Sequence, residues 1–138
     1  MNEPFVVEPT VMKDSTDCLI CCLRMLLGVG YAEIMSVLPK RCRGKVPRDG
    51  ISITQAANIA KKLGFSVAYH DEDFNPDYVG ILDVVRKHDE NEGHAVLYMM
   101  GVVYNPADNL LFTDLETFLT RGQWKVNGFL FRRTNADR

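Results

Sequence analysis

The sequence predicts an α+β fold, with an N-terminal helical part packed on a C-terminal antiparallel sheet. Segments with helical spacing of apolar residues come mostly first, and apolar segments that resemble strands come mostly last. Helices followed by strands in this way are typical of α+β proteins. The length of 138 residues suits one compact domain. We therefore expect a single domain over residues 1–138.

The first part of the chain is expected to contain a short edge strand and two helices. The strand is predicted at residues 5–9, FVVEP. Residues 18–27 carry one charge in ten positions, which indicates a helix buried on most sides, and Gly28 is placed to end it. Residues 31–38 predict a second short helix, and residues 40–50 predict a loop.

The middle of the chain begins with a helix start signal. Ser52 and Gln55 have the spacing of a capping box, the apolar residues that follow have helical spacing, and Gly64 ends the segment. Residues 65–69 predict a strand. Residues 78–88 predict a further helix, which would place His88 at a helix end.

The last part predicts most of the sheet. Residues 94–100 and 102–105 read as the two strands of a hairpin around Gly101. A short helix is expected at 114–122 and a last strand at 124–133. That strand is expected to place three aromatic residues in the core: Trp124, Phe129 and Phe131.

Charge and hydropathy exclude several classes of protein. The net charge is −2, so no overall field attracts nucleic acid or a membrane. No uncharged apolar run reaches the roughly 18–20 residues of a membrane helix, and the N-terminus lacks a signal peptide pattern. We therefore expect a cytoplasmic protein in a thiol-reducing compartment. The basic segment 40–48 is either a solvated loop or a site for an anionic partner, and the acidic segment 71–77 predicts a solvated loop.

Three cysteines lie within five positions of the first helix. Cys18 and Cys21 have CxxC spacing, but their spacer is Leu-Ile inside an apolar helix, and no second CxxC or HxxxH follows. A zinc knuckle is usually polar and contains glycine, so we expect neither a metal nor a cofactor. Buried cysteine behaves as a small hydrophobic residue, which is the interpretation for Cys21 and Cys22. Cys42 is expected to be an exposed thiol.

Cys18 differs because it stands at the start of the helix. Ser15, Thr16 and Asp17 precede it, and all three are residue types that cap helices. The helix dipole and the backbone N–H groups of the first turn favour a thiolate there, whereas the neighbouring Asp17 opposes it unless its side chain caps the helix. A nucleophilic cysteine also needs a base.

Of the three histidines, His94 is the candidate base. His70 is expected in a solvated loop. His94 follows Gly93 and heads the apolar segment AVLYMM. A polar residue in that place is either a strand cap or a general base at the rim of a sheet.

The hairpin then supplies a third residue. If Met100 and Gly101 form a two-residue loop, paired positions sum to 201, and Asn105 lies diagonal to His94 on the same face. Asn105 could then hold one ring nitrogen and leave the other for a thiol. A slip of one residue would instead move Asn105 to the opposite face and bring Asp108 beside His94. A bulged loop is a further alternative, because methionine is a poor first residue for a primed turn.

These segments resemble a known family. TDCLICCLRMLLGVGYAEIMSVLP is similar to the nucleophile helix of small papain-like cysteine peptidases, particularly the family that processes double-glycine leaders of bacteriocins, and of short relatives that are often phage-borne. GHAVLYMMGVVYNP resembles the histidine hairpin of the same family. The resemblance implies a papain-like fold with Cys18 as nucleophile, His94 as base and Asn105 as the residue that orients it.

Two positions depart from the family pattern. Met12 stands where the family usually has a glutamine that donates to the oxyanion, and Leu19 stands where many relatives have glycine. The leading hypothesis is a cysteine peptidase with a peptide or protein substrate. The alternative is a catalytically weak or inactive papain-like protein. In that case it would serve as a phage or bacterial structural component, or would bind a host factor, in the host cytoplasm or the virion.

Overall fold

The computed structural model describes residues 18–38, 51–70, 74–107 and 112–132. Several sequence predictions lie outside these ranges: the strand at 5–9, the loop at 40–50 with its basic segment, and the single residues Met12, Cys42 and Asp108.

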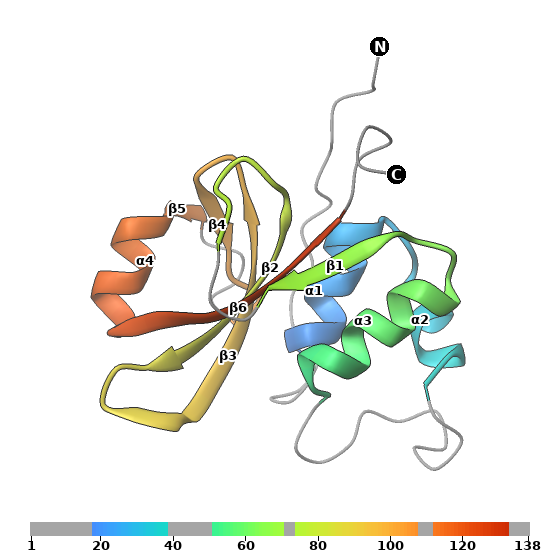
Figure 1. Ribbon diagram of the computed structural model, residues 1–138, viewed down its shortest axis with the longest axis horizontal. Coiled ribbons are helices and arrows are strands. Elements are labelled where there is room, and N and C mark those ends of the chain that lie inside the picture. Colours follow the sequence, from blue (N-terminus) through green and yellow to red (C-terminus); the bar gives the residue numbers. More distant parts are fainter. Residues whose placement is uncertain (1–17, 39–50, 71–73, 108–111, 133–138) are drawn as a thin grey trace.

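The described residues form a six-stranded antiparallel sheet with helices on both faces (Figure 1). The strand order is β1-β6-β2-β3-β4-β5. The strands are β1 (Val67–His70), β2 (Gly80–Arg86), β3 (Asp89–Met99), β4 (Val102–Tyr104), β5 (Phe112–Asp114) and β6 (Trp124–Arg132). The helices are α1 (Cys18–Leu27), α2 (Tyr31–Ser36), α3 (Ile53–Lys62) and α4 (Leu115–Gly122). The predicted α+β class, with a helical N-terminal part and a C-terminal antiparallel sheet, is confirmed.

The three N-terminal helices form where the sequence predicts them. Of the ten residues of α1, eight are buried, and Gly28 follows the helix with a φ of +69°, a conformation that glycine adopts without strain. α3 begins with the expected capping box. The Ser52 side chain accepts from the backbone N–H of Gln55, and the Gln55 side chain accepts from the backbone N–H of Ser52.

The helix predicted at 78–88 is wrong, because this segment forms β2. β2 lies in the middle of the sheet between β6 and β3, and each of its faces packs against an apolar cluster, so most of its residues are buried. A strand buried on both faces has no apolar–polar alternation and cannot be told from a buried helix by periodicity. His88 consequently lies in the turn between β2 and β3, not at a helix end.

Smaller corrections concern strand limits. β3 begins at Asp89, five residues before the expected start at His94. β1 begins at Val67 and includes His70, which was expected in a loop. β5 was not predicted, since its three residues are too short a pattern to detect.

The hairpin of β3 and β4 has the predicted register. Leu97 pairs with Tyr104, Tyr98 with Val103 and Met99 with Val102, so paired positions sum to 201. Met100 and Gly101 form the loop with φ values of +51° and +87°, as a primed two-residue turn requires. The bulged loop and the slip of one residue are therefore wrong.

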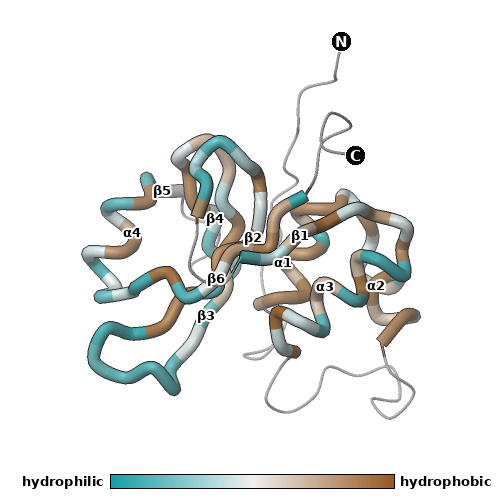
Figure 2. The backbone as a smooth tube through the Cα atoms, viewed as in Figure 1, coloured by the Kyte–Doolittle hydropathy of each residue, from teal (hydrophilic) through white to brown (hydrophobic). Residues whose placement is uncertain are grey.

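The sheet separates two apolar clusters. On one face, α1, α2 and α3 pack against Ile81, Ala95, Leu97 and Leu130. On the other face, α4 packs against a cluster that contains Val84, Val96, Tyr98 and the aromatic residues of β6. Figure 2 shows the apolar residues gathered on α1 and the middle of the sheet, and the hydrophilic turn of β2 and β3 projecting from it.

Candidate active site

The candidate base, His94, lies on the α4 face of the sheet. It pairs with Val84 of β2 and alternates with Val96, and both valines belong to the cluster on that face. The half-buried His94 ring stacks on Trp124 of β6, with 5.9 Å between ring centroids and 30° between ring planes. His94 therefore has one orientation set by the strand and by an aromatic neighbour.

Asn105 holds the imidazole, as the hairpin register predicts. Asn105 follows β4 and is buried. Its side-chain oxygen Oδ1 lies 2.8 Å from Nε2 of His94 and 3.0 Å from the backbone nitrogen of Ala107.

These two contacts also determine which ring nitrogen of His94 carries the proton. The backbone N–H of Ala107 can only donate, so the Asn105 atom that it meets is the oxygen, which can only accept. Nε2 of His94 must then donate to that oxygen. In the neutral ring, Nδ1 consequently carries the lone pair and is the basic nitrogen.

Cys18 is the first residue of α1 and is half-buried. α1 packs against β3, the strand of His94. Cys18 packs against the same apolar cluster as Ala95, the residue after His94. The structure thus brings His94 and Asn105 into direct contact and places Cys18 on the helix that packs against β3, the strand of His94.

The other two cysteines of α1 belong to the core. Cys21 and Cys22 have no exposed surface. Burial raises the pKa of the Cys22 thiol well above its usual value, and the nearby Cys18 and Cys21 raise it further. A thiol held neutral in this way is a poor nucleophile. The interpretation of Cys21 and Cys22 as packing residues is confirmed.

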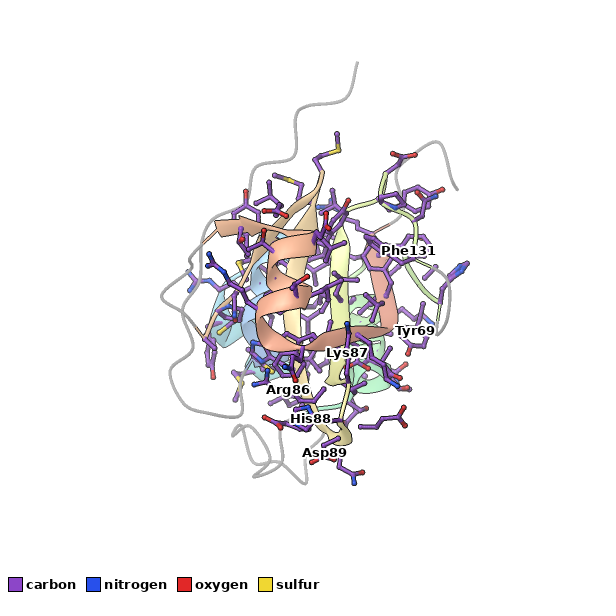
Figure 3. The ribbon with its side chains drawn as sticks, turned by 90° about the vertical axis from the view of Figure 1, so that its left-hand side faces the viewer. Tyr69, Arg86, Lys87, His88, Asp89 and Phe131 are labelled. Carbon is purple, nitrogen blue, oxygen red and sulfur yellow. The ribbon has the colours of Figure 1, made fainter. Side chains whose placement is uncertain are left out.

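Two residues of the site were missed at the level of sequence. Trp124 was expected only as a core residue, yet its ring also covers His94. Arg86 also contacts Trp124, with its guanidinium carbon 3.7 Å from the ring centroid. Figure 3 shows Arg86 near the last turn of α4, where the chain enters β6. No sequence signal connects these residues, because 38 positions separate Arg86 from Trp124 and the strands must first be paired.

The other two histidines lie away from this site. His70 is an exposed residue at the end of β1, and His88 is exposed in the turn of β2 and β3, which Figure 3 shows projecting below the sheet. Within the described ranges, no three His, Cys, Asp or Glu residues gather as metal ligands. None of the helices in these ranges is long and apolar enough to cross a membrane.

The fold and the histidine–asparagine pair define a papain-like cysteine peptidase. The Peptidase C39 family model matches residues 7–101, more than half of the chain, and the chain belongs to that family. The match contains Cys18 and His94 and ends before Asn105. The suspected resemblance is therefore confirmed.

Solved structures show the same fold. The peptidase domain of Streptococcus ComA, a bi-functional ABC transporter involved in a quorum sensing pathway, matches with a TM-score of 0.61 and 15% identity over 91% of this chain and 97% of that one. A double glycine motif protease from an AMS/PCAT transporter, in complex with the leader peptide, matches with a TM-score of 0.61 and 18% identity over 94% of both chains. The peptidase domain of Streptococcus mutans ComA matches with a TM-score of 0.56 and 16% identity, over 91% of this chain and 98% of that one. No curated protein sequence matches the chain.

Proposed function

We propose that this peptidase cleaves peptide bonds through an acyl-enzyme on Cys18, with His94 as the base and Asn105 as the residue that orients it. The contact between His94 Nε2 and Asn105 Oδ1 carries the proposal, because the Ala107 N–H fixes the direction of that hydrogen bond. It leaves Nδ1 as the nitrogen that takes a proton from the thiol.

The reaction needs no further titrating group. The Cys18 thiol gives its proton to His94 Nδ1, and the thiolate attacks the scissile carbonyl carbon. His94 then gives the proton to the leaving amine as the C–N bond breaks. In the second half, His94 takes a proton from water, the hydroxide attacks the thioester, and the Cys18 thiol is restored as the acid product leaves.

The oxyanion needs donors as it forms. Backbone N–H groups in the first turn of a helix can supply them, and the amide of Cys18 is the candidate. Met12 stands where the family usually has the glutamine that donates the second hydrogen bond, and a methionine side chain has no N–H. Loss of one such donor typically costs about 10²–10³ in rate.

A peptide is the substrate that the relatives support. One solved neighbour is a double glycine motif protease in complex with a leader peptide. We propose a peptide or protein substrate for this chain as well, with peptides that contain a double glycine as the first to assay. Cytoplasmic location, a phage origin and a virion or host-protein partner stay predictions from the sequence.

Alkylation tests the nucleophile directly. Iodoacetamide at neutral pH, followed by mass mapping, should label Cys18 faster than Cys42, and Cys18→Ala should abolish turnover. Cys21→Ala is the matched control on the same helix, because it removes a buried thiol that takes no part in the chemistry. If Cys18 labels no faster than Cys42 and Cys18→Ala keeps its activity, Cys18 is not the nucleophile.

Met12→Gln separates a slow enzyme from an inactive relative. If the chain is a non-catalytic binding protein that has lost the oxyanion donor, Met12→Gln should create peptidase activity where wild type has none. Turnover by wild type that Met12→Gln leaves unchanged would count against that alternative.

A further inference from the structure

A cavity of about 610 Å³ lies on the α4 face of the sheet and reaches the candidate base. Its lining includes Arg86, His94, Asn105, Phe118, Arg121 and Trp124. Within the described part of the chain, its lining comes from the strands, α4 and the segment after β4, and not from α1. The cavity therefore opens beside the imidazole on the face away from the helix of Cys18.

This position indicates which part of a substrate the cavity meets. The acyl carbon bonds to Cys18, whereas the leaving amine must lie within hydrogen-bond reach of His94, which protonates it. The chain beyond that amine then departs past the imidazole. A cavity that touches His94 and lies away from α1 is placed to hold residues on the leaving-group side.

The walls of the cavity favour a carboxylate. Arg86 and Arg121 supply two positive charges, and Glu92 supplies one negative charge. Glu92 is already paired with Arg86 at 3.2 Å. Arg86 also donates to the carbonyl oxygen of Gly122 and stacks on Trp124, so its guanidinium is held in place.

Arg121 is the cation at the exposed side of the cavity. Asp114 feels its charge, but both Asp114 carboxylate oxygens accept hydrogen bonds from Thr117 at the start of α4. The salt bridges among the described residues join Arg86 to Glu92 and Lys125 to Glu90, and neither includes Arg121. A guanidinium binds a carboxylate through two parallel hydrogen bonds, and Phe118 and Trp124 form an apolar wall beside it.

We propose that this cavity is a leaving-group-side subsite that selects an acidic residue among the first three residues after the scissile bond. The selection rests on the proposed peptidase function, whereas the binding of a carboxylate by the cavity does not. Arg121 is the residue expected to determine the preference, with Arg86 as a fixed cation behind it.

Trp124 offers a direct readout of binding, because it is the only tryptophan of the chain and lines the cavity. N-acetyl-aspartyl amide should change its fluorescence saturably, and N-acetyl-asparaginyl amide, the neutral match, should not. Arg121→Gln should weaken binding about two- to fivefold, the range of a solvent-exposed ion pair. Lys61→Gln, an exposed change on α3, should leave it unchanged. Equal responses to the two amides, or no response to either, would overturn the subsite.

Cleavage of a mixed peptide library, read by mass spectrometry, tests the selection. The peptides carry amidated C-termini, so that side chains are their only carboxylates. Wild type should enrich Asp and Glu about two- to fivefold at one of the first three positions after the cut, and Arg121→Glu should favour Lys and Arg there. Cleavage without any acidic preference would overturn the subsite and leave the peptidase standing. Carboxylate binding with no cleavage of any peptide would overturn the peptidase proposal and the leaving-group role together.

Discussion

The two faces of the sheet are built from different side chains. The face under α1, α2 and α3 is aliphatic, with leucine, isoleucine, methionine and cysteine closely packed and fully buried. The face under α4 is aromatic, and its rings are mostly edge-on or stacked. It also carries His94, Asn105 and the cavity.

This difference assigns stability mainly to the aliphatic face and chemistry mainly to the aromatic face. Flexible aliphatic side chains fill space without voids, which suits three helices docked on one face. Rigid rings leave space between them and can flank a polar group, which suits a histidine that must stay accessible. We therefore expect substitutions on the aliphatic face to change the free energy of unfolding, and substitutions around His94 to change the rate.

The largest expected effect is that of His94→Gln. It removes the base, so kcat/KM should fall about 10²- to 10⁴-fold with little change in stability. Val96→Ala is the matched control two residues along the same strand and face. It should lower the free energy of unfolding by about 1.5–3 kcal/mol and leave kcat/KM per folded molecule unchanged. An equal loss of rate in both variants would contradict the role of His94.

Leu23→Ala tests the aliphatic face. Leu23 is fully buried in α1, and such a truncation typically costs about 2–5 kcal/mol because a cavity remains. Leu119→Ala on α4 should cost less than half as much, since Leu119 is only partly buried. Urea unfolding measures both, and the same loss for both would show that the two faces are equally packed.

Asn105→Ala should lower kcat about 10- to 100-fold, because it frees the imidazole to rotate and small misplacements of catalytic groups are costly. Asn105→Asp keeps an oxygen acceptor for His94 and for the Ala107 N–H, so it should recover most of the rate. A structural role alone would predict that both variants lose stability and neither loses rate once folded.

The sequence predicted the parts of this molecule that rest on local signals. The capping box at Ser52, the glycine that ends α1 and the register set by a two-residue loop are each determined by a few neighbouring residues. The contact of His94 with Asn105 followed from that register. Different roles could be predicted for the three cysteines because Cys18 begins the helix, whereas Cys21 and Cys22 lie inside it.

The parts that were missed depend on the order of strands. β2 reads like a buried helix until β3 and β6 pair with its two edges and an apolar cluster covers each face. Gly80 reflects the close approach of β2 and β6, because a Cβ at this position would clash with the Leu130 carbonyl oxygen of β6. Trp124 reaches His94, and Arg86 reaches Trp124, only after these strands are paired, so the cavity could not be predicted without the sheet.

Asp83, in the strand that was mistaken for a helix, gives the smallest expected effect. It pairs with Ala95 and alternates with Ile81, which places a carboxylate on the aliphatic face. Burial raises the pKa of Asp83, and a hydrogen bond from Asn127 at the β6 bulge opposes the rise. The folded protein therefore holds this proton to a higher pH than the unfolded chain does.

The sign of the pH dependence follows. Between the ordinary pKa of aspartate and the raised value, the folded state binds more protons, so stability falls as pH rises through that interval. Asp83→Asn removes this loss and can still accept from Asn127. It should stabilise the protein at neutral pH by less than about 1 kcal/mol, because solvent screens a partly exposed carboxylate, and should give no gain at about pH 3, where aspartate is protonated in both states. Urea unfolding at the two pH values measures this difference, with the exposed Asp77→Asn as control. If Asp83→Asn raises the free energy of unfolding equally at both pH values, the destabilisation by Asp83 comes from its packing and not from its charge.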